Sequence, residues 1–350
     1  MRPLISVVMP VYNCPVRINS MLDSLEAQDY DPFELVIVDD GSTDATPDVL
    51  RALAASGRFP KLKLLGDGAN HGVSWARNVG FDASEGEYVI FLDADDMLPS
   101  DYLSRLESLA SEHGADYAAC GYKEFDVKTG RYNDVPLDVP GDVSTEDFIV
   151  GCITRKYRRS TLWAVLFRRD YLAKYNLRSH VGCCATQDRE LFIKSISRFG
   201  KGAFTRDPLY VYVLHDEMNT RRAGRRYRRY RDQTYAELRE ANYILRRSDN
   251  AKVRTAARCW LKVSAFCRVL ALQAMTGRRD RFDRLVRSKP LKRLLATHFR
   301  YLFRDPEKCF KIALVFLAPG LYYAHYSDAE HAVALPPRGD ASWAPRKEVR

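Results

Sequence analysis

Residues 33–44 read FELVIVDDGSTD, a continuous apolar run that stops abruptly at acidic and turn-forming residues. Two other stretches have the same form, ISVVMPVYN at residues 5–13 and EYVIFLDADD at residues 87–96, and residues 62–65 add a shorter apolar run. Between the first two runs, apolar side chains recur at helical spacing over residues 16–28. Buried strands that alternate with helices are typical of a parallel sheet covered on both faces. The sequence therefore predicts an α/β fold with a mostly parallel sheet flanked by helices.

Polar side chains follow each of the three longer runs. Because ligands bind outside the carboxyl ends of parallel strands, we expect Asn13, Asp39, Asp40, Asp93 and Asp95 to lie near one another. Two carboxylates spaced as Asp-x-Asp suit a hard cation, Mn²⁺ or Mg²⁺, that bridges a diphosphate. Two alternatives without a ligand stay open. The Asp-x-Asp pair can be a chance occurrence in a loop, and residues 39–42 can be an ordinary turn, because Asp, Gly and Ser are typical turn residues.

Residues 70–80 read NHGVSWARNVG, a pattern that indicates a loop entering a helix. Its glycines permit close approach of another group, and Arg77 is suited to face a phosphate. The alternative interpretation is a capped helix on the surface with no ligand.

Taken in order, four motifs resemble those of family 2 glycosyltransferases of the GT-A fold. They are PVYN at 10–13, VDDGSTD at 38–44, N-x-G at 70–72 with ARN-x-G at 76–80, and LDADD at 92–96. The resemblance covers residues 4–100 closely and continues loosely to about residue 220. It implies a Rossmann-like GT-A sheet, a nucleotide-sugar donor that by family habit is a UDP-sugar, a divalent cation (Mn²⁺ or Mg²⁺) and inversion at the anomeric carbon.

The same resemblance assigns roles to individual side chains. Pro10 and Tyr12 would line the base pocket, Asp39 would accept hydrogen bonds from the base, and Asp93 would face the ribose. Asp95 would bind the metal. The complete set of predicted donor-site residues is Pro10, Tyr12, Asn13, Asp39, Asp40, Arg77, Asp93, Ala94 and Asp95, and the candidate metal ligands are Asp95, Asp93 and His215.

A single displacement also needs a general base beside the acceptor hydroxyl. The family usually places a carboxylate at the start of a helix, and residues 187–192 read QDRELF. Asp188 is the predicted base. Gln187 stands where the family commonly has Glu, so Glu190 remains a reserve candidate. The alternative is that Asp188 only caps a helix.

Residues 209–215 read LYVYVLH and resemble the last strand of the catalytic domain. His215 falls where the family often has His or Arg near the diphosphate, although an isolated His is commonly structural. Residues 219–221 are expected to form a loop that closes over the donor.

The net charge of +10 conceals a strong asymmetry along the chain. Residues 221–350 hold 31 Lys and Arg against 12 Asp and Glu, a net charge of +19, so residues 1–220 carry −9. We therefore expect a catalytic domain at 1–220, with a nucleotide-sugar half (1–100) and an acceptor half (101–220). A basic amphipathic helical region at 221–330 and a flexible tail at 331–350 would follow.

Helical patterns in the basic region extend to about residue 247 and over residues 251–275, 281–297 and 307–318. Basic helices that carry aromatic residues are suited to an anionic membrane surface. A solvated helical subdomain is the alternative, and nucleic acid is not an expected partner, because no binding motif accompanies the charge. The best candidate for an uninterrupted apolar run, residues 312–324, has 13 uncharged positions and is too short to span a bilayer. With eight scattered cysteines, the sequence predicts a cytoplasmic protein, peripheral on the inner face of the cell membrane.

The leading functional hypothesis is an inverting, metal-assisted glycosyltransferase that acts on a glycan or polyisoprenoid-linked acceptor in cell-surface polysaccharide synthesis. The alternative from another class is a non-catalytic nucleotide-sugar-binding scaffold protein. A phosphohydrolase with an Asp-x-Asp nucleophile is a weaker third hypothesis.

Overall fold

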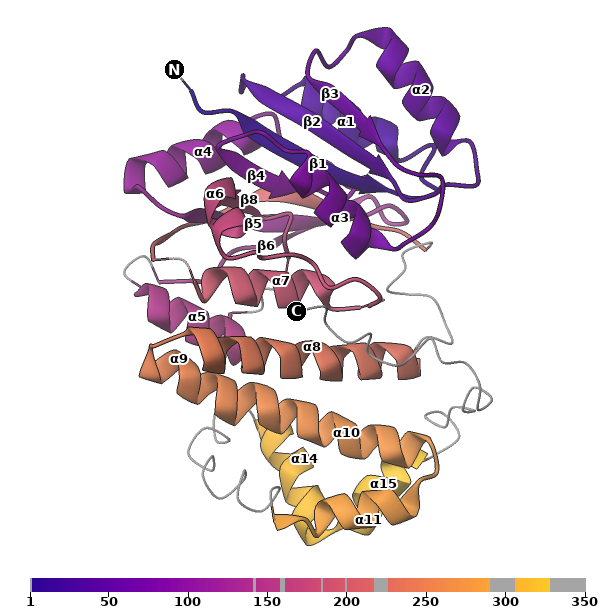
Figure 1. Ribbon diagram of the computed structural model, residues 1–350, viewed down its shortest axis with the longest axis vertical. Helices are drawn as coiled ribbons and strands as arrows, with labels where there is room; N and C mark the ends of the chain where they lie inside the picture. Colours follow the sequence, from indigo (N-terminus) through magenta and orange to yellow (C-terminus); the bar gives the residue numbers. More distant parts are fainter. Residues whose placement is uncertain are drawn as a thin grey trace. The chain divides into compact units, whose positions relative to one another are not determined.

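A computed structural model describes residues 2–140, 143–157, 161–183, 185–198, 200–216, 226–289 and 306–327 (Figure 1). The strands are β1 (Ile5–Val11), β2 (Phe33–Asp39), β3 (Leu62–Leu65), β4 (Tyr88–Phe91), β5 (Tyr117–Asp126), β6 (Arg131–Val135), β7 (Val165–Arg168) and β8 (Gly202–Leu214). The helices are α1 (Ile18–Glu26), α2 (Thr46–Ser56), α3 (Val73–Asp82), α4 (Tyr102–His113), α5 (Thr145–Ile153), α6 (Arg169–Lys174), α7 (Gln187–Ile196), α8 (Arg226–Arg247), α9 (Ala251–Ala256), the π-helical segment η2 (Ala257–Lys262), α10 (Val263–Met275), α11 (Arg279–Val286), α14 (Pro306–Leu317) and α15 (Pro319–Ser327).

The strands form one mixed sheet in the order β3-β2-β1-β4-β7-β5-β6, and β8 pairs with β5. Strands β1 to β4 are mutually parallel where they pair, whereas β7 runs antiparallel to both β4 and β5. The predicted α/β fold with a mostly parallel sheet is thus confirmed. The carboxyl ends of β1, β2 and β4 meet at one edge, which brings the three polar clusters together.

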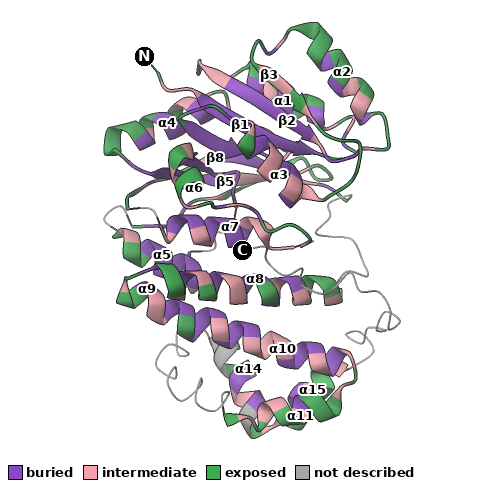
Figure 2. Cartoon of the chain, in the orientation of Figure 1, coloured by how far each residue is buried: buried purple, intermediate pink, exposed green. Residues whose placement is uncertain are grey.

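Helices cover the sheet on both faces, which explains the uninterrupted apolar character of the strands. All seven residues of β1 and all four of β4 are buried, as the purple strands in Figure 2 show. One face packs against α1 and α4, and the opposite face packs against α5 and α7. A strand that is buried on both faces needs apolar residues at consecutive positions rather than in alternation.

Beyond the end of β4, the chain forms an isolated bridge with β8. Met97 and Val211 exchange two backbone hydrogen bonds of 3.1 Å in an antiparallel bridge. This pairing carries the chain from Asp93 to Asp96 alongside the end of β8. Residues that are about 120 positions apart in the sequence therefore share the same edge of the sheet.

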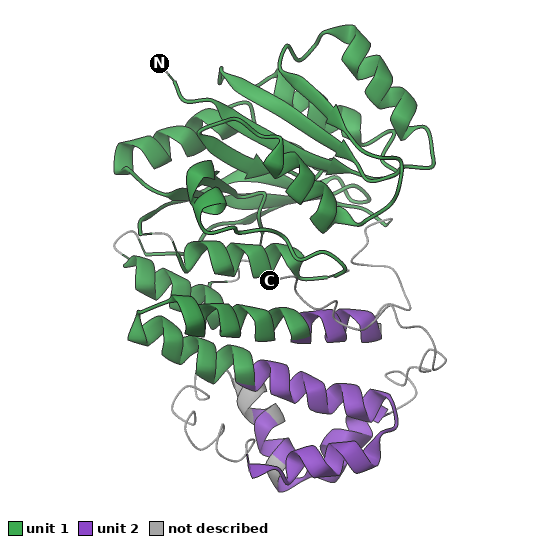
Figure 3. Cartoon of the chain, viewed as in Figure 1, with its two compact units in different colours: residues 1–223, 235–262 green, residues 224–234, 263–350 purple. Residues whose placement is uncertain are grey.

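The chain divides into two compact units, coloured separately in Figure 3. The first comprises residues 1–223 and 235–262, and the second comprises residues 224–234 and 263–350. The boundary expected at residue 220 therefore differs from the observed one, because residues 235–262 carry apolar side chains that pack into the first unit's core. The expected helices to 247, over 251–275 and over 307–318 are present.

The second unit has its own apolar core, which includes Leu270, Phe282, Val315 and Tyr322. The tail expected at 331–350 and the loop expected at 219–221 lie outside the described residues, as do residues 290–297 of the helix expected at 281–297. In the part of the chain that the structure describes, no helix has both the length and the apolar character needed to cross a bilayer.

Candidate functional site

Helix α3 lies unusually close to the sheet, and this approach fixes the position of Arg77. A Cβ atom at Gly80 would lie 2.5 Å from Cγ1 of Val8 and 3.2 Å from Cγ2 of Val38, so only glycine allows this contact. Ala76 is fully buried on the same helix. Arg77 follows it, and its side chain is only 3% exposed.

The guanidinium of Arg77 joins two carboxylates that are far apart in the sequence. Its Nη2 donates to Oδ1 of Asp93 at 2.9 Å, and its Nη1 donates to Oδ1 of Asp188. The side chains of Asp93 and Asp188 are 29% and 28% exposed, so both carboxylates also reach solvent. The structure thus places the predicted base beside the predicted Asp-x-Asp motif, which sequence spacing alone does not establish.

The surroundings of Asp93 raise its pKa to about 6. Burial is the main cause, and the charges of Asp188 and Asp95 add to it, while Arg77 opposes the shift. Three carboxylates close together in a partly dry site repel one another and attract positive charge. Such a site is suited to a cationic or metal-associated ligand.

Asp95 faces His215, another candidate metal ligand at this edge. Oδ2 of Asp95 lies 3.0 Å from Nε2 of His215. Asp96 fixes this arrangement, because its buried carboxylate accepts hydrogen bonds from the Tyr210 hydroxyl at 2.5 Å and from the Val213 backbone N–H at 2.8 Å. Burial raises the pKa of Asp96 well above its usual range. Asp96 therefore has a structural role that the motif did not separate from its neighbours.

The donor set at this point suits a divalent cation with help from substrate. Among the described residues, no cluster of three or more His, Cys, Asp or Glu could hold a metal ion by itself. A carboxylate and an imidazole are nevertheless good ligands for Mn²⁺, and Mg²⁺ commonly binds through one or two carboxylates plus phosphate oxygens and water. Asp93 contributes less, because Arg77 already occupies its Oδ1.

Of the two aspartates at the end of β2, Asp40 is bound by the protein itself. Its buried carboxylate accepts backbone hydrogen bonds from His71 at 2.8 Å and from Gly72 at 2.9 Å, and a side-chain bond from Asn70 at 3.1 Å. Asp40 thus holds the loop that leads into α3. Asp39 is less engaged, with one hydrogen bond of 3.0 Å from the Ser42 N–H.

The remaining predicted donor residues lie along the same edge. Asn13 has a left-handed φ of 49° and links to the loop after β2, where its Oδ1 accepts from the Thr43 N–H at 2.8 Å. Tyr12 is 46% exposed next to it, whereas Pro10 and Ala94 are buried. The structure brings these residues to one edge of the sheet, and their individual roles toward a nucleotide stay predictions.

The loop before α7 is attached to α3, which explains how Asp188 reaches Arg77. The side chain of Asn78 exchanges two hydrogen bonds of 2.9 Å with the backbone of Ser179. Thr186 occupies the N-cap of α7 with a left-handed φ of 66°, and Asp188 lies in the first turn. Asp188 is therefore not the cap residue that the alternative interpretation expected, and its carboxylate contacts Arg77 instead.

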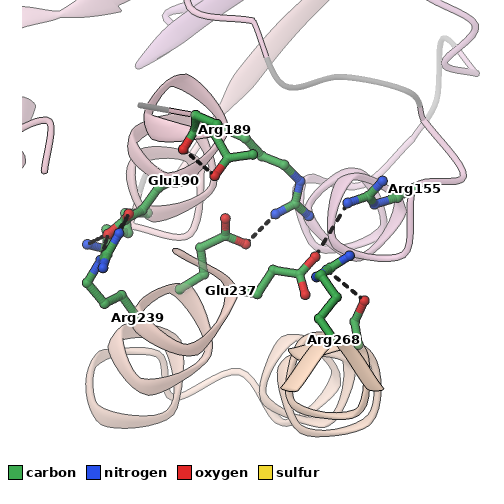
Figure 4. Close-up of polar contacts among 11 residues, drawn as sticks. Arg155, Arg189, Glu190, Glu237, Arg239 and Arg268 are labelled. Carbon is green, nitrogen blue, oxygen red and sulfur yellow. Dashed lines mark hydrogen bonds and ion pairs between the residues drawn. The ribbon is translucent and has the colours of Figure 1, made fainter. Parts of the chain in front are cut away.

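The reserve base, Glu190, does not belong to this site, and that expectation is corrected. Its buried carboxylate is bound by Arg239 of α8 through contacts of 2.6 to 3.0 Å (Figure 4). It also pairs with Lys194. Burial favours a higher pKa for Glu190, but the hydrogen bonds and charges of Arg239 and Lys194 outweigh it and lower the pKa.

Sequence reasoning missed a further pair beside it. Arg189 forms an ion pair with Glu240 of α8, and both side chains are buried. Burial raises the pKa of Glu240 to about 7, with a further rise from the charge of Glu237, although Arg189 opposes the shift. The signal was present in α8, where Glu237 and Glu240 occupy the same helix face as the buried Ala241 and Ile244.

Comparison with known proteins places this chain in a wider group. The family model described as glycosyl transferase family 2 matches residues 6–195, more than half of the chain. YibD of Escherichia coli, described as an uncharacterized glycosyltransferase, is 30% identical over 217 residues, which is 61% of this chain and 62% of the relative. The GalNAc(5)-diNAcBac-PP-undecaprenol beta-1,3-glucosyltransferase of Campylobacter jejuni is 30% identical over 149 residues, 42% of this chain and 48% of the relative.

Solved structures share the fold at low sequence identity. Residues 1–349 of Staphylococcus aureus TarS, crystallised with UDP-GlcNAc, match with a TM-score of 0.59 at 18% identity over 91% of both chains. The mannosyltransferase PcManGT of Pyrobaculum calidifontis, in complex with GDP-Man and Mn²⁺, matches with a TM-score of 0.53 at 20% identity over 93% of this chain and 87% of the neighbour. The chain spans about three fifths of the length of the first curated relatives.

Proposed function

Because the chain belongs to glycosyl transferase family 2, we propose that it transfers a sugar from a UDP-sugar to a hydroxyl group of a glycan or lipid-linked acceptor. The contact of Arg77 with both Asp93 and Asp188 carries this proposal. This contact brings one carboxylate of the Asp-x-Asp motif and the proposed base to the same buried guanidinium, which supports a donor side and an acceptor side next to each other. The acceptor belongs to cell-surface polysaccharide synthesis, a role supported by the undecaprenol-linked substrate in the name of the Campylobacter relative.

In the proposed reaction, Asp188 acts as general base. It removes the proton from the acceptor hydroxyl while the acceptor oxygen forms a bond to the anomeric carbon. The bond from that carbon to the diphosphate oxygen breaks on the opposite face, so the configuration inverts. Arg77 holds Asp188 in place and contributes positive charge beside the leaving diphosphate.

The metal in this proposal is Mn²⁺ or Mg²⁺, held by Asp95 and His215. When bound, a divalent cation supplies positive charge that stabilises the departing diphosphate. Asp93 faces the ribose, and Asp39, Pro10 and Tyr12 contact the base. A complex of the TarS neighbour with UDP-GlcNAc supports a uridine nucleotide, whereas the complex of the PcManGT neighbour with GDP-Man makes a guanosine nucleotide the alternative to test.

Release of nucleoside diphosphate from a panel of UDP- and GDP-sugars, measured with Mn²⁺ and with EDTA, tests the proposal. We expect slow hydrolysis of one or a few UDP-sugars with Mn²⁺, since water replaces the missing acceptor, and loss of the activity with EDTA. Asp95→Ala should abolish the turnover without loss of folding, because its carboxylate is 40% exposed. Binding of a nucleotide sugar without any turnover, for wild type and variant alike, would favour a non-catalytic scaffold.

We also propose that the basic region attaches the protein to the inner face of the cell membrane. Net charge of +19 lies after residue 220, and the second unit exposes Phe310, Leu317 and Leu321 by 65%, 85% and 66%. Basic residues near an anionic bilayer each contribute about 1 kcal/mol, and exposed apolar side chains add a salt-resistant part.

Flotation with liposomes that contain anionic lipid tests the attachment. Binding should weaken as salt rises, because electrostatic screening shortens to about 3 Å at 1 M. Leu317→Ser together with Leu321→Ser should remove the remainder that survives high salt. Failure to float at low salt would leave a solvated helical subdomain as the better interpretation.

A further inference from the structure

The chain on both sides of Asp188 is held by one side chain from α8. Nε of Arg239 donates to the two carboxylate oxygens of Glu190 at 2.8 and 3.0 Å, and its Nη2 donates to Oε2 at 2.6 Å. The same Nη2 lies 3.2 Å from Sγ of Cys183. One guanidinium therefore contacts the chain five residues before Asp188 and two residues after it, as the arrangement in Figure 4 indicates for Glu190.

The carboxylate of Glu190 is buried between two basic side chains, Arg239 and Lys194. Its side chain is 2% exposed, so its charge is removed from water and is stabilised only by Arg239 and Lys194. Leaving this buried carboxylate without its partner would lower the free energy of unfolding by several kcal/mol. Arg189, the neighbouring residue, is fixed in the same way by Glu240. These contacts set the rotation of α7 about its axis.

That rotation determines where Asp188 points. Successive residues of an α-helix are about 100° apart, so Asp188 and Glu190 leave α7 in nearly opposite directions. With Glu190 directed to α8, Asp188 is directed to Arg77 on α3. The left-handed φ of 66° at Thr186 is unfavourable for a residue with a branched side chain, and it persists only where the surrounding contacts hold it.

We propose that Arg239 is a positioning residue for Asp188, acting through Glu190 and Cys183. The proposal rests on the proposed function, in which Asp188 is the base. Arg239 does not touch the donor side in this arrangement. Its replacement should therefore lower the turnover number and leave the affinity for nucleotide unchanged.

The experiment compares full-length Arg239→Gln, Arg239→Lys and the matched control Arg246→Gln. Arg246 lies on the same helix but is exposed. We measure kcat for hydrolysis of the preferred UDP-sugar, Kd for UDP with Mn²⁺ by calorimetry, and the thermal midpoint. Arg239→Gln should lower kcat about ten- to a hundredfold, as expected when a reacting group is displaced by about 1 Å, with Kd for UDP within twofold of wild type. Arg239→Lys should recover part of the loss, because one ammonium replaces the charge but cannot contact both Glu190 and Cys183.

A double-mutant cycle with Asp188→Asn separates positioning from a general structural effect. If Arg239 acts through Asp188, Arg239→Gln should cause almost no further loss of kcat in the Asp188→Asn background. An equal loss in both backgrounds, or unchanged kcat in the single variant, would overturn the proposal. If Arg239→Gln fails to fold, Arg239→Lys is put through the same cycle. Asp188→Asn alone tests the base, because unchanged kcat in that variant contradicts the proposed function whatever Arg239 does.

Discussion

Three consecutive residues of α7 take part in two ion-pair clusters of different character. The edge cluster consists of Asp188, Arg77 and Asp93, and the interior cluster consists of Arg189, Glu190, Arg239 and Glu240. In the edge cluster a buried cation contacts carboxylates that are more than a quarter exposed. In the interior cluster both carboxylates are buried and face arginines of the neighbouring helix.

This difference in burial suits the edge cluster to ligand binding and the interior cluster to holding α7 in position. A carboxylate that reaches water can exchange its protein partner for a ligand with little desolvation, which suits the edge cluster to its role in the proposed function. Removing one partner of a buried ion pair lowers the free energy of unfolding by several kcal/mol, so the interior cluster resists rearrangement. In the proposed function, α7 thus uses one face for chemistry and the opposite face for its own placement.

The largest effect is expected at the edge cluster. Asp188→Asn keeps the size of the side chain and an oxygen that can accept from Arg77, but it cannot take a proton. Turnover of the donor should fall about 10²- to 10⁴-fold, the usual contribution of a general base. Rapid-quench or radiolabel assays at high enzyme concentration measure the residual rate, and calorimetry should show UDP binding within about threefold of wild type. Lost UDP affinity with unchanged kcat would instead place Asp188 on the donor side.

A second prediction compares the clusters by stability. Arg189→Met leaves the carboxylate of Glu240 buried without its partner and should lower the free energy of unfolding by about 3–5 kcal/mol. Arg77→Met should lower it by less, because water can solvate Asp93 and Asp188. Urea unfolding followed by circular dichroism measures both. A larger loss of unfolding free energy for Arg77→Met than for Arg189→Met would contradict the assignment of the structural role to the interior cluster.

Much of the polar site at the carboxyl edge of the sheet could be predicted from sequence for a simple reason. Asp39, Asp93 and Asp95 directly follow apolar runs, and the ends of parallel strands are forced to meet. The position of Asp188 could not be predicted in this way, because no local sequence pattern brings residue 188 close to residue 77. The resemblance to a known family supplied that choice, and the structure supplies the contact.

The interior cluster could not be predicted, although its residues were visible. Charge between residues 221 and 247 suggested a solvated or membrane-facing helix, because charged side chains are rarely fully buried unless paired. Glu240 and Arg239 of this helix pair with Arg189 and Glu190, which lie about 50 positions earlier. Sequence alone gives no pairing at that separation. The same pairing adds to the apolar contacts that join residues 235–262 to the first unit, across the boundary suggested by charge.

The smallest predicted effect concerns pH and the interior cluster. In the folded protein the pKa of Glu240 is raised from 4.5 to about 7, chiefly by burial and by the charge of Glu237, while Arg189 opposes the rise. The folded state then binds a proton more tightly than the unfolded state, so the stabilising contribution of this group is complete below about pH 4.5 and is lost as the pH rises to about 7.

Glu240→Gln removes this titration while keeping an oxygen that accepts from Arg189. The free energy of unfolding of the wild type should therefore fall, relative to that of the variant, by at most about 3 kcal/mol between pH 5 and pH 7.5, since one pKa unit corresponds to about 1.4 kcal/mol. Urea unfolding of both proteins across that range gives the difference. Parallel curves would mean that Arg189 keeps Glu240 ionised throughout, and the interior cluster would then balance its charges without a proton. A difference that grows with pH would show that burial outweighs the ion pair, in contrast to Glu190, where Arg239 and Lys194 together lower the pKa.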